Sequence, residues 1–457
     1  MKNNLKEKKL KHQSRKQSII EGSFTTIRTS FGDSYISPFA IAINAGNATI
    51  AMLSSITGLL GPLSQLFSSR LIEKYKRKKI LTTSTFYESL LWISFILIAF
   101  LFYKGILISF LPFLLLFFFA IYTIIANIPI PAWFSWMGDI VDKGYRGKWF
   151  AKRNFIIGTI SLLTSIIAAI FLDFTKKQNI VMFGFIILFF LAMTARLISR
   201  QFFKKAYEPK LKLERGYYFS FFEFIKKATK NNFGRFSIFR AFMGFAASIA
   251  SPFFAVYMLR NLGFSYIIYM IITVSQTMFS LILIKAWGKF ADKYGNYEVL
   301  KITSVLIPLY PILWLISSNP LFLVFGPALI GGIAWAGFNL SAGNFVFDSV
   351  TPQKRSLAVS YFHLLNGAGV FLGAGLGGIL AKTINITFMD SLLFIFLISA
   401  FARMLVSLIF LPKIKEIRKI QKFNSSRALK NLAFGILRKP HFESNVYHLG
   451  IKKRYKK

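Results

Sequence analysis

The sequence predicts an all-α membrane protein in which twelve transmembrane helices form two pseudo-symmetric six-helix bundles. The first observation is composition: the 457-residue chain is 54% hydrophobic and 17% aromatic, more apolar side chain than a soluble domain of this length can bury. The second is a series of long apolar runs, such as 90–103 and 106–125, which approach or reach the roughly 20 residues of a bilayer span. The third is a set of motifs that occurs once in each half of the chain.

The apolar runs predict six spans in each half. The first six lie near 24–44, 49–72, 80–103, 106–130, 154–172 and 180–202. The last six lie near 236–259, 266–287, 299–316, 321–346, 359–381 and 388–411. The chain therefore divides into a basic N-terminal tail (1–23), an N-terminal bundle (24–203), a cytoplasmic linker (204–235), a C-terminal bundle (236–412) and a basic C-terminal tail (413–457). The linker is basic with aromatic residues, a composition that suits an interfacial amphipathic helix.

Basic residues are concentrated in the tails and in alternate turns. The chain has 57 Lys and Arg against 17 Asp and Glu, a net charge of +40. With the N-terminus inside, about 47 of the bases lie on the internal side, which agrees with the positive-inside rule. The external turns hold Lys104, Lys176, Lys177, Arg260 and Lys382. We therefore expect a multi-pass protein of the cell (plasma) membrane with both termini cytoplasmic, whose partner is the lipid bilayer and not nucleic acid.

Signatures of enzymes and cofactors are missing from the sequence. No cysteine is present, so neither a disulfide nor a thiolate metal site is available. The histidines are scattered, at His12, His363, His441 and His448, which does not suit a metal site. No G-x-x-x-x-G-K-S/T phosphate loop occurs, so transport driven by ATP is not supported. We expect no enzyme activity, no metal and no cofactor.

One charged corner of the chain occurs twice. The loop 288–295 reads GKFADKYG and places an acid–base pair, beginning at Asp292, just after the eighth apolar run. A weaker copy at 69–78 reads SRLIEKYKRK and places Glu73 and its following base just after the second run, 219 residues earlier.

Three further correspondences extend this repeat. Asp139 and Arg146 follow the fourth run, as Asp348 and Arg355 follow the tenth, and in both pairs the base comes seven residues after the acid. The other matching positions are Arg28 with Arg240 and Ala195-Arg196 with Ala402-Arg403. Offsets of 207–219 residues in all four cases indicate two parallel six-helix repeats.

Two such repeats with acid–base corners resemble the major facilitator superfamily of secondary transporters, over about residues 24–412. Loop 288–295 resembles the signature of this family between helices eight and nine, and 69–78 resembles its counterpart between helices two and three. The first copy departs from the pattern, with Ser69 and Lys76 where glycine is usual. The segments after the fourth and tenth spans also resemble uncharacterised prokaryotic members, a likeness that names no substrate.

The resemblance implies that the charged corners form a gate at the cytoplasmic face. The gate candidates are Glu73, Asp292, Arg146, Arg355, Asp139 and Asp348. In the family the signature acid pairs with bases of the opposing half and closes that face, so the first two acids would pair with the two arginines. The alternative is that these are ordinary charged turns that follow the positive-inside rule.

Asp33 is the strongest candidate for a functional group inside the membrane. It lies a third to a half of the way through the first span, and an ionisable group at that depth is costly and marks a candidate site. By resemblance, the first helix lines a central cavity with helices four, seven and ten. An isolated carboxyl there could take and release a proton during transport. The alternative is a structural ion pair with Arg28 or Arg240.

Polar residues in the same helices complete the candidate substrate site. Arg28 and Arg240 either hold an anionic substrate or snorkel to the inner interface. Trp335 and Asn339 stand four residues apart and share one face of the tenth helix. The other candidates are Asn127 and Tyr257, with Ser37, Asn44, Tyr122 and Ser251. Each of these could equally make an interhelical hydrogen bond.

The remaining charged residues of the spans have structural interpretations. Glu88 is expected to pair with a neighbouring base. Arg196, Lys285 and Arg403 lie near inner ends and are expected to snorkel.

These features predict a secondary active transporter that moves a small organic solute by alternating access. A proton is favoured over sodium as the coupling ion, Asp33 is the coupling group, and we expect a monomer. Two alternatives stay open: a facilitator without ion coupling, and a non-transporting membrane protein of the same fold that handles lipid or senses a signal.

Overall fold

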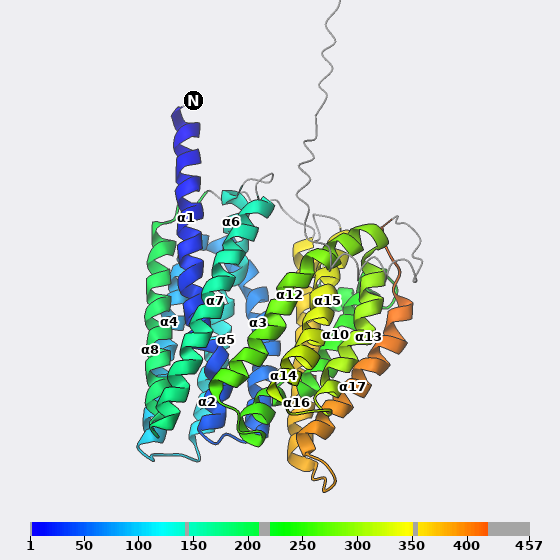
Figure 1. Cartoon of the computed structure of the whole chain (residues 1–457). Coiled ribbons are helices and arrows are strands. Elements are labelled where there is room, and N and C mark those ends of the chain that lie inside the picture. Colours follow the sequence, from blue (N-terminus) through cyan, green and yellow to red (C-terminus); the bar gives the residue numbers. More distant parts are fainter. Residues whose placement is uncertain (1, 142–145, 210–219, 351–354, 419–457) are drawn as a thin grey trace, which may run out of the picture.

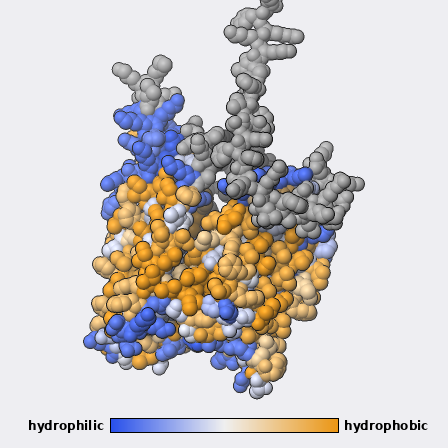
Figure 2. All heavy atoms as spheres, in the orientation of Figure 1, coloured by the Kyte–Doolittle hydropathy of each residue, from blue (hydrophilic) through white to orange (hydrophobic). Residues whose placement is uncertain are grey.

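A computed structural model describes residues 2–141, 146–209, 220–350 and 355–418. Within these ranges every regular element is helical, and the helices form two groups side by side (Figure 1). We call helices α1–α8 the N half and helices α10–α17 the C half. Apolar side chains cover the middle of the molecule and polar ones gather at both ends (Figure 2). This distribution suits a protein whose middle is surrounded by lipid and whose two ends face water.

The helices follow the predicted spans, several of them broken into shorter pieces. The N half holds α1 (Lys2–Phe31), α2 (Ile36–Ala42), α3 (Asn47–Lys74), α4 (Arg77–Tyr103), α5 (Leu111–Asn127), α6 (Pro129–Ile140), α7 (Arg146–Lys177) and α8 (Val181–Lys205). The short helix α9 (Phe221–Ala228) precedes the C half. The C half holds α10 (Asn232–Ala250), α11 (Phe253–Val256), α12 (Tyr266–Tyr294), α13 (Asn296–Leu313), α14 (Pro320–Leu323), α15 (Leu329–Ser349), α16 (Arg355–Thr383) and α17 (Ser391–Phe410).

Ten of the described helical segments are long and apolar enough to cross a membrane. The first and ninth predicted spans fall outside this count, because the first is interrupted between α1 and α2 and α13 carries Glu298 and Lys301 near its start. Both still run within the bundle (Figure 1), so the structure is consistent with twelve helices. The predicted bundle limits, 24–203 and 236–412, stay predictions.

The first helix begins at Lys2 instead of near residue 24, so the basic N-terminal segment continues the first span. Its inward side is buried: Ser14 Oγ accepts a hydrogen bond from the Tyr207 N–H at 2.7 Å. Glu21 is 3% exposed and lies 3.6 Å from Arg153 Nη2. Packing against the ends of α7 and α8 therefore sustains the helix where the sequence lacks an apolar run.

The first span of each half is broken near its middle. In the N half the break falls at Gly32, where a Cβ would lie 2.2 Å from the Trp92 ring, and the chain turns through Asp33–Tyr35 before α2. In the C half it falls at Pro252, which has no N–H to continue the helical ladder. Broken helices inside a membrane place backbone polar groups against protein or a cavity, so the breaks mark the centre of the molecule as a candidate site.

Helix α16 joins the halves by packing against α3 on one side and α10 on the other. A Cβ on Gly367 would lie 2.2 Å from the Gly58 carbonyl oxygen in α3. Further along, a Cβ on Gly377 would lie 2.2 Å from the Ile249 carbonyl oxygen in α10. Glycine therefore lets three helices approach to backbone contact.

We expect Gly377→Ala to destabilise the protein, because the added methyl group overlaps the Ile249 carbonyl and forces α10 away. The loss should be about 1–3 kcal/mol in the free energy of unfolding, measured by thermal unfolding of the purified protein. Gly375→Ala is the matched control in the same helix, since a Cβ there would find its nearest neighbour at 3.9 Å. Equal stability of the two variants would contradict the close packing.

Candidate functional site

A cavity with two adjoining chambers lies between the halves, at the level of the broken helices. Both chambers are lined by Ser37, Ser54 and Ser251. The N-half chamber has a volume of about 590 Å³, and its polar lining includes Arg28, Asp33, Tyr122, Thr123 and Asn127. The C-half chamber has a volume of about 390 Å³, and its lining includes Phe254, Tyr269, Tyr310, Trp314, Trp335 and Arg403. Both volumes suit a small organic molecule.

Asp33 lies on the wall of the N-half chamber, in the turn that breaks the first span. Arg28 Nη1 forms an ion pair with Asp33 Oδ2, and the Tyr122 hydroxyl donates a hydrogen bond to Oδ1. The Asp33 side chain is 33% exposed, whereas that of Arg28 is 10% exposed. The ion pair foreseen as the structural alternative for Asp33 is therefore present, and its partner is Arg28, not Arg240.

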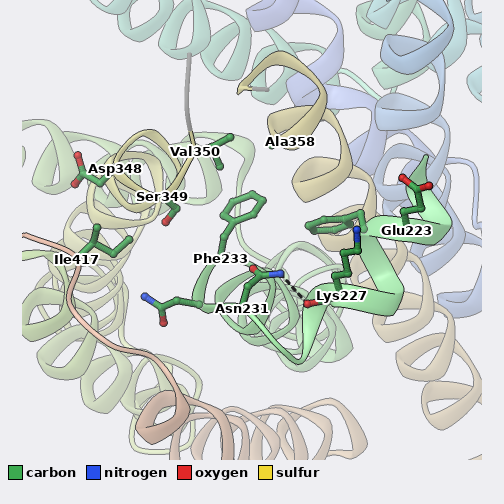
Figure 3. A pocket seen from close by; sticks show the side chains of 11 residues that line it. Glu223, Lys227, Asn231, Phe233, Asp348, Ser349, Val350, Ala358 and Ile417 are labelled. Atoms are coloured by element: carbon green, nitrogen blue, oxygen red, sulfur yellow. Dashed lines mark hydrogen bonds between the residues drawn. The ribbon is translucent and has the colours of Figure 1, made fainter. Parts of the chain in front are cut away.

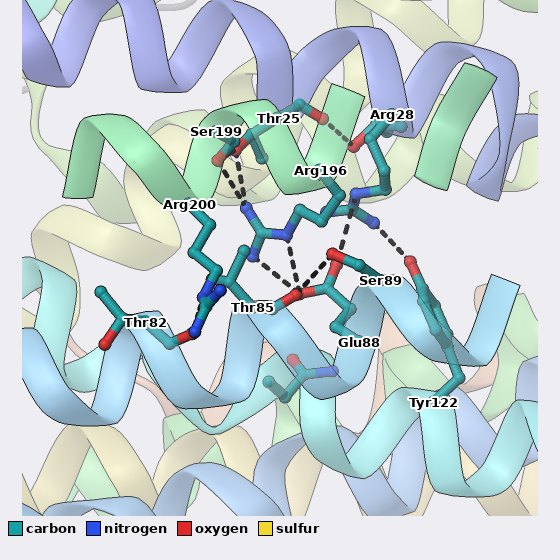
Figure 4. Close-up of polar contacts among 12 residues, drawn as sticks. Thr25, Arg28, Thr82, Thr85, Glu88, Ser89, Tyr122, Arg196, Ser199 and Arg200 are labelled. Carbon is teal, nitrogen blue, oxygen red and sulfur yellow. Dashed lines mark hydrogen bonds and ion pairs between the residues drawn. The ribbon is translucent and has the colours of Figure 1, made fainter. Parts of the chain in front are cut away.

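Glu88 of α4 is completely buried and holds two arginines together (Figure 4). Its Oε2 accepts hydrogen bonds from Arg196 Nε and Nη2 at 2.9 and 2.7 Å, and its Oε1 lies 3.4 Å from Arg28 Nε. The predicted pairing of Glu88 with a base is confirmed. The predicted snorkelling of Arg196, and the same alternative for Arg28, are wrong, because a carboxylate within reach stabilises each guanidinium inside the bundle.

The corresponding arginines of the C half have different surroundings. Arg240 Nη2 donates to Asn339 Oδ1 at 3.3 Å, and its guanidinium carbon lies 5.9 Å from the Trp335 ring centroid and 5.1 Å from that of Phe338. Arg403 is 1% exposed, so its predicted snorkelling is wrong as well. Among the ion pairs within 4.0 Å that join described residues of the C half, neither arginine takes part.

The cavity brings together most of the predicted site residues. Arg28, Asp33 and Asn127 line one chamber and Trp335 lines the other. Asn127 Oδ1 accepts a hydrogen bond from Gln65 Nε2 at 3.1 Å, which ties it to α3. Tyr257, in contrast, packs against Trp314 and Phe396 in the core and is not among the residues that line either chamber.

At the N-terminal end of the molecule, Arg77 makes the ion pairs of the charged corner between α3 and α4. Its Nη1 donates to Asp139 Oδ2 at 2.6 Å, and its Nε lies 3.6 Å from Glu208 Oε1 in the segment after α8. Arg77 is 1% exposed. The predicted gate acid Asp139 is therefore engaged within its own half.

The charged corner of the C half has a similar arrangement, but its cation comes from a different position in the sequence. Asn296 stands where the N half has Arg77, and its Nδ2 donates to Asp348 Oδ2 at 3.1 Å. The missing guanidinium comes from Arg418, after α17, whose Nε donates to the same oxygen at 2.6 Å and whose Nη1 lies 3.6 Å from Asp292 Oδ1. The hydrogen bond to Asp348 raises the pKa of Arg418 above its ordinary value. The side chains of the other predicted gate residues, Glu73, Arg146 and Arg355, lie outside the described residues.

A separate cavity of about 500 Å³ lies beside this corner (Figure 3). Its lining includes Asp348 and Ile417 on one side and Glu223 and Lys227 of α9 on the other. It shares no lining residue with the two central chambers, so it belongs to the corner and not to the site between the halves.

Two sets of polar contacts join the halves at the end opposite the N-terminus. Asp173 of α7 accepts hydrogen bonds from the backbone N–H groups of Tyr266 and Ile267, at 2.7 and 2.9 Å, and so caps α12 of the other half. Arg260 donates to the Ala45 carbonyl at 2.7 Å and to Asn47 Oδ1 at 2.8 Å. We call these contacts the far-end latch. Sequence reasoning missed Asp173, although it is the one acid in the predicted turn between spans five and six.

Two helical bundles around a central cavity with polar, charged and apolar lining residues, with bonds between them at one end, form the architecture of a multi-pass transmembrane transporter. The family model of the Major Facilitator Superfamily matches residues 236–446. The matched residues make up less than half of the chain, and this C-terminal part is similar to the superfamily.

Solved structures with the same fold cover almost the whole chain. The nucleoside transporter NupG aligns with a TM-score of 0.63 and 16% identity, over 88% of this chain and 98% of that one. A bacterial homologue of the iron transporter ferroportin, in its inward-facing state, gives 0.65 and 13%, over 88% and 98%. A bacterial homologue of the human lysosomal transporter Spinster gives 0.57 and 14%, over 90% and 99%. No curated relative matches the sequence significantly. Identities this low show the shared fold and carry no substrate to this chain.

We expect Arg418→Gln to lower the free energy of unfolding by about 1 kcal/mol, since it removes a charge-assisted hydrogen bond that is partly exposed. Adding Asn296→Arg to that variant should recover the loss, because it restores the cation position of the N half. Thermal unfolding of the three proteins tests both steps. Failure of the second substitution to recover stability would contradict the proposed equivalence of the corners.

We expect Asp173→Ala to weaken the far-end latch, because α12 loses the acceptor for two backbone N–H groups. The loss of such a cap, about 1 kcal/mol, should raise the population open at that end about fivefold. The chain has no cysteine, so Ser37→Cys reports access to the cavity through its rate of labelling by an impermeant maleimide in sealed proteoliposomes.

Ser265→Ala is the matched control for the latch. Ser265 Oγ accepts from the Ile268 N–H at 3.3 Å, so it caps the same helix without crossing between the halves. Labelling that rises equally in both variants would show that fraying of α12, and not loss of the latch, opens the cavity.

Proposed function

We propose that the protein is a secondary active transporter that moves a small organic solute by alternating access at the cavity between the halves, driven by a proton gradient. Asp33 is the proton-binding group in this proposal. The observation that carries it is the position of Asp33: a carboxylate at a helix break, on the cavity wall and 33% exposed.

The coupling step in this proposal is the separation of Asp33 from Arg28. While the two are paired, the cation stabilises the ionised carboxylate. Arg28 also lies 3.4 Å from Glu88, so a second carboxylate is in place to receive it. A carboxylate that loses its cation in a membrane-embedded cavity binds a proton, because its charged form is far costlier there than in water.

We place the N-terminal end of the molecule in the cytoplasm and the protein in the cell (plasma) membrane. The support is the concentration of lysine and arginine in the predicted internal turns and tails. The far-end latch then lies outside, which leaves the cytoplasmic side for entry of the solute in this conformation. A monomer suffices, since one chain supplies both halves and the complete cavity.

A second candidate is a facilitator without ion coupling. It is favoured by the same Arg28–Asp33 pair, if the pair stays intact throughout the cycle. A non-transporting membrane protein of this fold is the third.

We expect Asp33→Asn to abolish accumulation of the solute against its gradient while leaving solute exchange intact, because the amide keeps the shape of the side chain but does not carry a proton between the two sides. The measurement is flux of a broad mixture of solutes into proteoliposomes with an imposed pH gradient. Asp390→Asn is the control, since Asp390 caps α17 outside the cavity.

Accumulation that is unchanged in Asp33→Asn would contradict the coupling role. Flux that does not depend on the pH gradient in the native protein would favour the facilitator. No flux of any solute would favour the non-transporting alternative.

A further inference from the structure

The two halves carry equivalent arginines but balance their charges differently. In the N half, the buried network of Figure 4 extends to Glu21 and Arg153. Its ion pairs join three carboxylates and three guanidinium groups: Glu21, Asp33 and Glu88 with Arg28, Arg153 and Arg196. These six ion-paired groups carry no net charge together, which lowers the cost of burying them in a membrane.

The C half has no acid available for the same purpose. From α9 to the end of the described chain, the acidic residues are Glu223, Asp292, Glu298, Asp348, Asp390 and Glu416. All of them lie in α9, at the ends of the long helices or outside them. Arg240 and Arg403, the counterparts of Arg28 and Arg196, are thus two cations in the interior of a bundle without a carboxylate.

One substitution between the repeats accounts for the difference at Arg403. Glu88 and Ile307 each stand eleven residues after the first residue of their helix, at Arg77 and Asn296. The side chain that neutralises Arg196 in the N half is therefore replaced by an isoleucine that is 0% exposed.

Arg403 is held by neutral groups instead. Its Nη1 donates to the Ile307 carbonyl at 3.2 Å, an acceptor left free in α13 because Pro311 has no N–H. Its Nη2 donates to the Ala247 carbonyl at 3.2 Å, and its Nε to Ser399 Oγ at 3.1 Å. These three bonds orient the guanidinium, but two of its five N–H groups remain and no bond of this kind cancels the charge.

The Arg403 side chain borders a cavity. Arg403 is one of the residues that line the C-half chamber, and it is 1% exposed. Phe254, Tyr310 and Trp314 form an aromatic wall beside it, with ring centroids of Phe254 at 5.0 Å from those of both other rings. Such a chamber suits a molecule with one anionic group and a flat apolar body.

We propose that the C-half chamber is an anion subsite, in which Arg403 holds the carboxylate or phosphate of a small organic anion whose apolar part lies against Phe254, Tyr310 and Trp314. This inference rests on the proposed transport function and names its substrate class. Arg240 lies two turns before Ala247 on the same side of α10, and its positive charge favours entry of an anion along that side.

The test uses the full chain in lipid nanodiscs and follows thermal unfolding with added probes. Benzoate, succinate and inorganic phosphate are the anions, and benzamide is the uncharged partner of benzoate. We expect a rise in the unfolding temperature that saturates with anion concentration, with no rise for benzamide. Benzoate alone marks a carboxylate site with an aromatic body, whereas phosphate alone marks a phosphate site. Equal shifts for benzoate and benzamide, or none for any anion, would overturn the proposal.

The decisive variants are Ile307→Glu and Ile307→Gln, which have nearly the same size and differ in charge. Ile307→Glu recreates the N-half arrangement and neutralises Arg403, so its affinity for the active anion should fall about tenfold or more relative to Ile307→Gln, as expected for the loss of a charged hydrogen bond. Equal affinities in the two variants would overturn the proposal.

A second pair serves if the Ile307 variants do not fold. Arg403→Lys keeps a cation and should keep anion binding, whereas Arg403→Gln should lose it. Loss of binding in both, with unchanged unfolding temperatures, would contradict a charge-based subsite.

Flux measurements on the same preparations separate this inference from the transport proposal. Saturable anion binding without transport of any solute would support the subsite and remove the transport function. Transport of neutral solutes without anion binding would support the transport function and overturn the subsite.

Discussion

Burying a charged side chain in a bilayer is costly, and the clamp, as we call the contacts of Glu88 with Arg28 and Arg196, lowers that cost at the centre of the N half. The clamp joins α1, α4 and α8 through one buried carboxylate. It also fixes Arg28 beside Asp33 at the break in the first span. The two acids therefore contact the same arginine, which positions Arg28 and Asp33 on the wall of the N-half chamber.

The same architecture occurs twice with different chemistry. The N-half chamber is lined by the ion pair of Arg28 and Asp33, while the C-half chamber is lined by aromatic rings and a buried cation, Arg403. A repeat gives both halves the same helix breaks and the same arginine positions, yet Glu88 in one is Ile307 in the other. In the proposed function, an asymmetric cavity of this kind separates the binding of a proton from the binding of a solute between the two halves.

The polar contacts at the two ends of the molecule differ in whether they lie within one half or between the halves. At the N-terminal end, Arg77 and Arg418 tie corners within their own halves. At the opposite end, Asp173 and Arg260 bridge the halves. In the proposed alternating-access cycle, bonds of the first kind keep each bundle rigid, while bonds of the second kind break when the cavity opens at the far end.

The sequence by itself determined the fold class, because long apolar runs and a repeat of 207–219 residues constrain a chain in lipid strongly. It also predicted Asp33 as a candidate site residue, since a carboxylate in an apolar span is rare. Only the tertiary structure decided its partner, and only it placed Arg196 and Arg403 inside the bundle instead of at the interface. Whether a long side chain snorkels or turns inward depends on the orientation of its helix and on the distance to neighbouring helices. Hydropathy along the chain contains no information on either quantity. For the same reason Asp173 escaped notice: its function is to cap a helix that begins 93 residues later in the sequence and beside it in space.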